Sequence, residues 1–222
     1  MHYTIRKTAR PPTLTGDWNG SIWSEAETLT IELFHPKSST HRPGVSARLL
    51  YDDKGIYVHF KVQDQYIRSV NTRPMDPVCQ DSCVEFFFKP KSGGGYLNVE
   101  GNCGGTFLAF YIEDHRRSPN GFEKFTRLDL NWMAQIRSYH TLPTIVDPEI
   151  TAPCEWQLEY VIPIPLIEAY TGPLGSLSGQ TWQANFYKCG DKTSHPHWGS
   201  WASIGDALDF HQPEKFAAIC FQ

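Results

Sequence analysis

The stretch that constrains the fold most is residues 78–102, in which two alternating segments flank a glycine-rich turn. The first segment, VCQDSCVEFFFKP, is followed by KSGGG and then by YLNVEGN. Successive side chains of a β-strand point to opposite faces, so each segment predicts one apolar face and one polar face. The predicted hairpin rests its apolar face on a core and presents Glu85, Asn98 and Glu100 outward. This outward sheet face is where we look for function.

Further short segments with the same alternation predict a chain built mainly of strands. The clearest is a second hairpin, whose arms 45–51 and 56–64 flank the turn DDKG. Other predicted strands cover residues 29–34, 107–114, 155–162, 181–188 and 216–221, and short helices are expected within 130–139 and 165–170. Residues 115–121, HRRSPNG, are predicted to form a loop. Many short strands with turn signals predict an all-β fold, an antiparallel β-sandwich with one or two short helices, as a single domain over residues 1–222.

Charge and hydropathy exclude several classes of partner. The formal net charge is −4 and no long basic run occurs, which argues against a nucleic-acid partner. No apolar run approaches the roughly 20 residues needed to cross a bilayer, so no membrane partner is expected. The opening residues, MHYTIRK, contain no apolar segment typical of a signal peptide. We therefore expect a cytoplasmic protein, or an extracellular one if a leader has been removed.

Six cysteines are scattered along the chain without CxxC pairs. They are Cys79, Cys83, Cys103, Cys154, Cys189 and Cys220. In a domain of this size we expect buried thiols rather than a disulfide framework or a metal knuckle.

Carbohydrate binding is the function that the polar face favours. Sugars offer hydroxyls, which pair with carboxylates and amides, and apolar C–H faces, which stack on aromatic rings. The candidate ligand contacts are Glu85, Asn98, Glu100, Asn102, Asn185 and Tyr187, overhung by Trp198 and Trp201. The alternative is that these residues form a solvated outer face and that both indoles lie in the core, since sheets often have one wet face.

Two other functions stay open on the residues alone. Glu85 and Glu100, on paired strands, could supply the two carboxyls of a glycoside hydrolase. His195 and His197, with His59 or Cys189 as a further ligand, could bind a metal, although imidazoles at this short spacing also hydrogen-bond a loop backbone.

Several motifs in order resemble carbohydrate-binding module family 9. They are WSEA at 23–26, the strand 57–64 that ends in Asp64, QDSCVEFF at 80–87, the Tyr96/Asn98/Glu100 strand, and WQANFY at 182–187 followed by Trp198. The resemblance runs over nearly the whole chain. It implies a sandwich of jelly-roll type that binds sugars without catalysis, in type members the reducing ends of glucans and xylans. It also implies a bacterial role in carbohydrate catabolism, commonly in association with a glycoside hydrolase.

The resemblance also implies roles for individual residues. In the family the sugar lies between two tryptophans and is hydrogen-bonded by a glutamate and by polar groups of neighbouring strands. Glu85 matches the glutamate, Asn185 matches a late-strand asparagine, and Trp198 or Trp201 matches one wall. The second wall normally comes from the loop just before Asp81, which has no tryptophan here.

The long loop 65–80 supplies the remaining candidates. Loops of this length are often binding loops, so Tyr66, as a replacement wall, and Arg73 are candidate ligand contacts. No cofactor is expected for binding. Some family members hold structural calcium, for which Asp52, Asp53 and Asp64 are candidate ligands, while turn chemistry also explains the first two.

Overall fold

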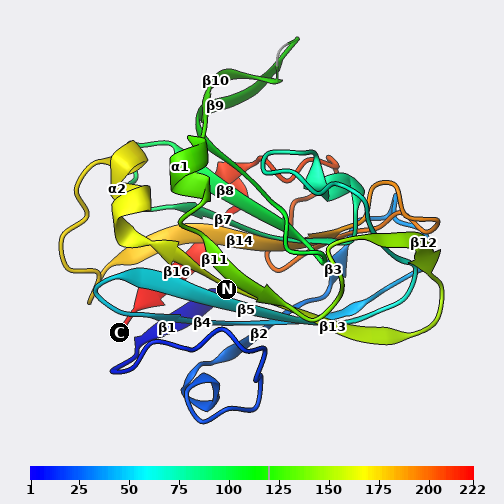
Figure 1. Cartoon of the computed structure of the whole chain (residues 1–222). Helices are drawn as coiled ribbons and strands as arrows, with labels where there is room; N and C mark the ends of the chain where they lie inside the picture. Colours follow the sequence, from blue (N-terminus) through cyan, green and yellow to red (C-terminus); the bar gives the residue numbers. More distant parts are fainter. Residues whose placement is uncertain (120) are drawn as a thin grey trace.

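Two β-sheets packed face to face form the computed structural model, which describes residues 1–119 and 121–222 (Figure 1). The sheet that carries the predicted site, here the site sheet, runs in the order β10 (Gly121–Arg127), β9 (Phe107–Ser118), β8 (Tyr96–Asn102), β7 (Cys83–Lys89), β14 (Thr181–Cys189) and β16 (Ala217–Phe221). The back sheet runs in the order β2 (Thr28–Ile31), β4 (Gly44–Tyr51), β5 (Gly55–Asp64), β13 (Cys154–Pro163) and β11 (Arg137–His140). The central pairings of both sheets are antiparallel, so the predicted β-sandwich is confirmed.

The first strand of the chain joins the two sheets. β1 (His2–Lys7) pairs with β16 through residues 2–5 and with β4 through Arg6 and Lys7, in both cases in parallel. Tyr3 and Ile5 on this strand are buried in the core between the sheets. The sequence analysis assigned no strand here, although the alternation of these apolar residues was a signal for one.

Smaller elements complete the fold. They are β3 (Leu33–Phe34), β6 (Ile67–Ser69), β12 (Val146–Ile150), β15 (Trp198–Ser200), α1 (Leu130–Met133), α2 (Ile164–Thr171) and the 3-10 turns Trp23–Glu25, Val78–Gln80 and Pro213–Lys215. Both helices lie where they were predicted. No helix in the described part of the chain is long and apolar enough to cross a membrane.

The expected loop at residues 115–121 is wrong for most of its length. β9 continues to Ser118 and β10 begins at Gly121, so the two strands form a hairpin that projects from the body of the molecule (Figure 1). Residue 120 lies outside the described residues. The basic residues of this segment hid the strand, because on a projecting hairpin both faces reach solvent and the apolar alternation disappears.

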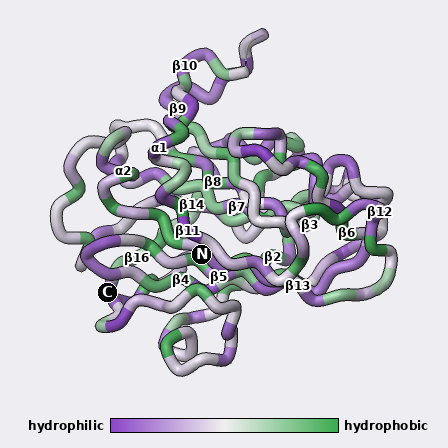
Figure 2. Tube along the Cα trace, viewed as in Figure 1, coloured by the Kyte–Doolittle hydropathy of each residue, from purple (hydrophilic) through white to green (hydrophobic). Residues whose placement is uncertain are grey.

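The core lies between the two sheets and follows the predicted alternation. Phe86 of β7 stacks on Phe186 of β14 with ring centroids 4.7 Å apart, and Phe60 of the back sheet packs against Phe186 edge to face. Figure 2 shows hydrophobic and hydrophilic residues alternating along the central strands. Strands with this period bury every second side chain, and each large one contributes about 1.5–3 kcal/mol when fully buried.

The opposite face of the site sheet is covered by protein, whereas the sequence analysis expected it to face water. Ile204 and Phe216, from the segment 201–216, pack on Phe87, Tyr96 and Tyr187 of that face. The polar residues expected to face outward, Glu85, Asn98 and Glu100, are buried. Periodicity showed which side chains share the face, but a covering loop is a tertiary contact that periodicity does not contain.

Candidate functional site

Three rows of directly paired residues cross the covered face of the site sheet. The rows are Asn185–Phe87–Asn98, Tyr187–Glu85–Glu100 and Cys189–Cys83–Asn102, each from β14 through β7 to β8. Residues paired directly across antiparallel strands point to the same side of the sheet. The register thus brings the predicted strand residues together on one face.

A pocket of about 250 Å³ opens above the middle row. Glu85 and Glu100 lie at its floor, and both carboxyl groups are buried. Asp191 and Trp198 line it from the segment after β14, and Phe210 lines it from the covering segment 201–216. The pocket thus combines carboxyl groups with aromatic surface.

Trp198 is held as a wall of this pocket. Its indole Nε1 donates a hydrogen bond of 2.7 Å to Asp191 Oδ1. Its backbone N–H donates to Ser38 Oγ, and its carbonyl accepts from the His35 N–H at 2.8 Å. The side chain is only partly buried. A partly exposed indole with a fixed orientation is the arrangement on which a sugar ring can stack.

The two floor carboxyls sit in an environment that disfavours their charge. Burial and the neighbouring Glu100 charge raise the pKa of Glu85 well above its ordinary value. Burial raises the pKa of Glu100 to about 7, against the hydrogen bond of 2.7 Å that Asn98 Nδ2 donates to it. Near neutral pH the pair therefore both donates and accepts hydrogen bonds, as sugar hydroxyls do.

The rim of the pocket is closed by residues of the covering segment and the β9–β10 hairpin. Arg117 and Asp209 form an ion pair with 2.8 Å between Nη2 and Oδ1. Phe210 stacks on Tyr187 with ring centroids 4.1 Å apart, and the Tyr187 hydroxyl donates to the Phe210 carbonyl. Tyr187, a predicted ligand contact, thus lies beneath Phe210 and supports the pocket wall.

Four predicted strand and loop contacts have structural partners instead of facing the pocket. Asn185 bonds to the Ala202 backbone through both amide atoms, and Asn102 bonds to the Asn71 carbonyl, the Asp81 carboxylate and the Thr106 N–H. Asn98 donates to Glu100 through Nδ2 and accepts from the Phe110 N–H through Oδ1, and it is not among the residues that line the pocket. The expectation that Trp201 overhangs the site is wrong, because this indole is buried in the core edge to face with Phe186.

The two contacts predicted from the loop 65–80 lie elsewhere. Tyr66 stacks on His195 with ring centroids 3.6 Å apart, and Arg73 is exposed beside Asp76. Neither lines the pocket, so the expectation that Tyr66 replaces the second wall is wrong. From this loop the pocket receives Cys79. The loop instead contains β6, which pairs with β12 and so takes its residues to another part of the surface.

The predicted pair His195 and His197 does not converge on a metal. His197 Nε2 lies 2.7 Å from the buried Lys188 Nζ, and His197 Nδ1 bonds the His195 carbonyl. Lys188 in turn lies 3.3 Å from Asp64, whose carboxylate also accepts from Trp156. An ammonium group among these side chains fills the position that a cation would take.

The three calcium candidates do not gather at one point. Asp52 accepts from the N–H groups of Lys54 and Gly55 in the hairpin turn, and Asp53 pairs with Lys7. Asp64 is engaged in the buried cluster with Lys188. Turn chemistry therefore accounts for Asp52, as the sequence also allowed.

The cysteines are all free thiols, as predicted. Cys83, Cys103 and Cys189 are buried, and the others are partly buried. Cys79 and Cys189 line the pocket, which the sequence analysis did not foresee. Asp191, Asp209 and Phe210 also line the pocket and were not predicted. The signal for the last two was the motif LDFH at 208–211, which sets a carboxylate beside an aromatic residue in a segment without regular alternation.

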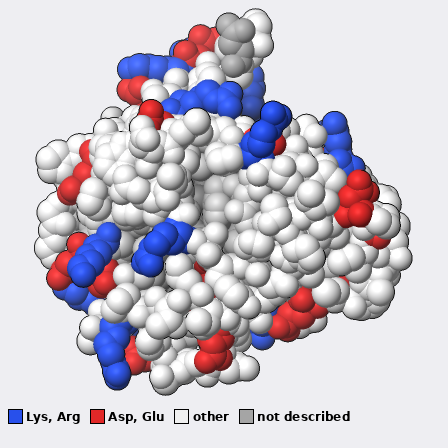
Figure 3. All heavy atoms as spheres, in the orientation of Figure 1, with Lys and Arg blue, Asp and Glu red and all other residues white. Residues whose placement is uncertain are grey.

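A larger hollow of about 580 Å³ lies on the back sheet beside Thr30, Arg42 and Lys61. Its lining residues include no tryptophan, and their one carboxylate, that of Glu32, is exposed. We assign the site to the smaller pocket because convergent polar groups beside aromatic surface matter more for recognition than volume. On the face shown in Figure 3, acidic and basic side chains are interspersed rather than gathered in one patch.

A β-sandwich whose pocket sets buried carboxyls beside one indole has the groups that a carbohydrate-binding domain needs. The family model for carbohydrate-binding family 9 matches residues 22–221, and the chain belongs to this family. Membership assigns carbohydrate binding to the chain, in agreement with the sequence analysis.

Solved structures agree with this family. A Bacteroides uniformis protein for which carbohydrate binding has been inferred is 28% identical, with a TM-score of 0.86 over 100% of this chain and 99% of its own. A family 9 module from Caldicellulosiruptor kristjanssonii in complex with glucose is 16% identical, with a TM-score of 0.62 over 99% of this chain and 95% of its own. A structure of a family 9 module from the same organism in complex with cellotriose is 16% identical, with a TM-score of 0.61 over 100% of this chain and 94% of its own. Among functionally curated proteins, none matches this chain.

Proposed function

We propose that the pocket above Glu85 and Glu100 binds one sugar ring, with hydroxyls on the two carboxyls and a C–H face on Trp198. The observation that carries the proposal is the position of this fixed, partly exposed indole beside two buried carboxyls in one pocket. The glucose and cellotriose complexes of the Caldicellulosiruptor kristjanssonii module support it as examples of ligands held on the same fold.

The size of the pocket supports a small ligand. Its volume of about 250 Å³ is below the roughly 300–1,000 Å³ of pockets that enclose drug-sized ligands. A monosaccharide or the terminal residue of an oligosaccharide suits this space. Cys79 lines the pocket from the loop that supplies the second tryptophan in family members, so we expect stacking on one face of the sugar only.

The placement of the two glutamates favours binding over hydrolysis. A glycosidase needs two carboxyls that flank the scissile bond. Glu85 and Glu100 are instead neighbours on the same floor of the pocket, from adjacent strands. Association with a glycoside hydrolase on another polypeptide stays part of the proposal. We do not include a calcium site in the proposal, because Asp52, Asp53 and Asp64 bond other protein groups.

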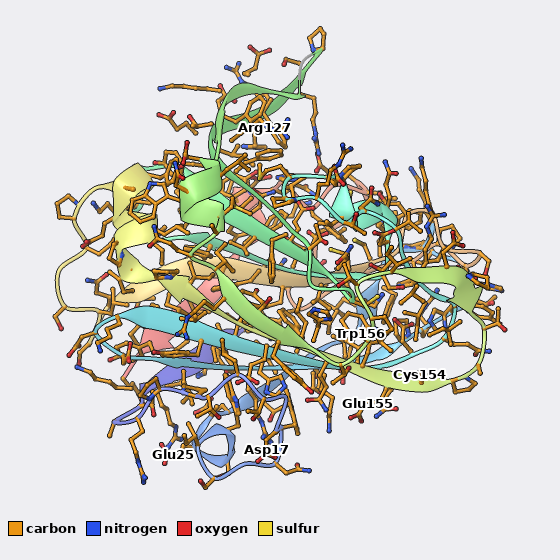
Figure 4. The ribbon with its side chains drawn as sticks, in the orientation of Figure 1. Asp17, Glu25, Arg127, Cys154, Glu155 and Trp156 are labelled. Atoms are coloured by element: carbon orange, nitrogen blue, oxygen red, sulfur yellow. The ribbon has the colours of Figure 1, made fainter. Side chains whose placement is uncertain are left out.

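Isothermal titration of the reduced, chelator-treated protein with glucose, cellotriose and a panel of other mono- and oligosaccharides tests the proposal. We expect at least one sugar to bind and E85Q and W198A to weaken binding by about tenfold, since a hydrogen-bonding group left unsatisfied in a buried site costs about 1–3 kcal/mol and loss of an aromatic contact costs a similar amount. E155Q and W132A are the controls, because Glu155 is an exposed carboxylate and Trp132 a partly exposed indole outside the pocket. In β13 the side chain of Glu155 points away from the core while that of its neighbour Trp156 points into it (Figure 4). Silence across the panel from folded protein, or wild-type affinity in both site variants, would overturn the proposal.

A further inference from the structure

Two buried thiols lie next to Glu85, one lining the pocket and one beside it, and sugar binding does not explain them. We propose that Cys83, Cys189 and Glu85 form a binding site for one thiophilic divalent cation of the zinc class. The proposal concerns a second ligand and stands or falls independently of the sugar.

The geometry of the three side chains is close to that of a bound cation. Cys83 and Cys189 are direct cross-strand partners on β7 and β14, and Glu85 follows on the same face of β7. The two Sγ atoms and a Glu85 carboxylate oxygen all lie within 4.8 Å of one another, and Cys189 Sγ is 3.1 Å from Glu85 Oε1. In a tetrahedral zinc site, bond lengths of about 2.0–2.3 Å place the ligand atoms roughly 3.5–3.8 Å apart. Shifts of a few tenths of an ångström to about 1 Å would therefore complete the arrangement.

The ligand types and their surroundings suit a soft cation. Two thiolates with one carboxylate are preferred by zinc and cadmium over calcium or magnesium, which take oxygen ligands. All three side chains are buried on rigid strands, so ligand positions are fixed before metal arrives. Binding displaces the two thiol protons and the proton that Glu85 carries when neutral, and all of them pass to solvent.

The site has both an entrance and further donors. Cys189 and Glu85 line the open pocket, so a cation reaches them from solvent. Cys79 and Asp191 line the same pocket and can supply the remaining ligand, as can water. A site closed on three sides with one position facing a pocket is the arrangement of open zinc sites.

Charge distinguishes this set from a second group of potential ligands. His41, Asp64 and His197 are also close together, but Lys188 Nζ lies 2.7 Å from His197 Nε2 and 3.3 Å from Asp64. At the cysteine set, Arg117 of the pocket rim is already paired with Asp209. The cysteine set is therefore the one where a cation meets donors without an ammonium group among them.

Metal and sugar are coupled in this arrangement because Glu85 belongs to both sites. Any effect of the cation on sugar affinity is matched by an equal effect of the sugar on cation affinity.

Direct metal titration of the reduced full chain after chelator treatment tests the proposal. Zn²⁺ binding is measured by calorimetry, and Cd²⁺ binding by the ultraviolet thiolate-to-cadmium absorption, both without sugar. We expect one ion per chain, retained in the control C154S/C220S and weakened about 100-fold or more in C83S/C189S, with loss of the cadmium absorption. If C83S/C189S fails to fold, E85Q replaces it, with an expected weakening of about tenfold. Absence of stoichiometric binding to the wild type, or unchanged binding in the site variants, would overturn the proposal. Because no sugar is present, this failure differs from a failure of the sugar-binding site.

Discussion

Glu85 and Glu100 are direct cross-strand partners, and both carboxyls are buried at the floor of one pocket. Like charges directly opposite each other destabilise a sheet, and burial adds to the cost of ionising them. A pair of this kind is explained by a ligand that satisfies it. Residues that serve binding often lower the stability of the protein, so their replacement can raise it.

The first prediction is that E100Q stabilises the protein while it weakens sugar binding. E100Q removes the cost of holding a buried charge, and we expect a gain of about 1–3 kcal/mol in unfolding free energy at pH 8, where Glu100 would otherwise be ionised. Urea denaturation measures the gain, and titration calorimetry measures the loss of affinity. A lower stability of E100Q would show that the two carboxyls share a stabilising contact instead.

The second prediction separates the two late tryptophans. W198A should lose sugar affinity with little loss of stability, because this indole is partly exposed and lines the pocket. W201A should lose about 3–5 kcal/mol of stability, because its indole is buried in the core against Phe186. Thermal denaturation of both variants checks the difference. Equal destabilisation by the two substitutions would contradict the assigned positions.

The third prediction concerns the buried ion pair between the sheets. Lys188 of the site sheet and Asp64 of the back sheet are 3.3 Å apart, and both side chains are fully buried. K188M leaves the Asp64 carboxylate without its ammonium partner and should cost about 3–5 kcal/mol in urea denaturation. The exposed pair Lys7–Asp53 provides the control, since K7M should leave the midpoint unchanged. A K188M midpoint equal to that of the wild type would rule out this role.

The fourth prediction is a loss of stability in mild acid through His59. Burial lowers the pKa of His59 to about 4 from 6.5, since its ring packs edge to face against Trp18 and Trp23, and its Nε2 bonds Gln157 Oε1. Between these two values the unfolded chain binds a proton that the folded chain does not, so stability is complete above pH 6.5 and falls as pH drops towards 4.

The measurement is the unfolding free energy of the wild type and H59Q as a function of pH. H59Q should show a smaller fall over this window, and the exposed-site variant H2Q should follow the wild type. Part of the fall will remain, because burial also lowers the pKa values of His197 and His211 to about 3. Parallel curves for the wild type and H59Q would contradict the prediction.

The alternation of residues 83–89 was enough to predict both faces of β7, because a strand has a fixed period of two. The same rule placed Glu85 beside Glu100 once the hairpin was recognised. Trp198 and Trp201 could not be separated in this way. Trp198 begins β15 and Trp201 directly follows this strand, and only tertiary packing decides that one faces the pocket and the other the core.

The pocket wall formed by Phe210 was beyond sequence reasoning for a related reason. Its segment, 201–216, has no regular period and folds over the site sheet through contacts such as that between Phe210 and Tyr187. For the loop 65–80, the sequence analysis predicted ligand contacts that the structure does not contain. Its length indicated a binding loop, but β6 pairs with β12 and directs Tyr66 to His195 instead.

The most direct test of the central claim is a crystal structure of the protein grown with cellotriose, or with the sugar that binds most tightly in titration. The account predicts one sugar ring stacked on Trp198 with hydroxyls within hydrogen-bond distance of Glu85 and Glu100. A sugar seated in the hollow beside Thr30 and Lys61, with this pocket unchanged, would contradict it.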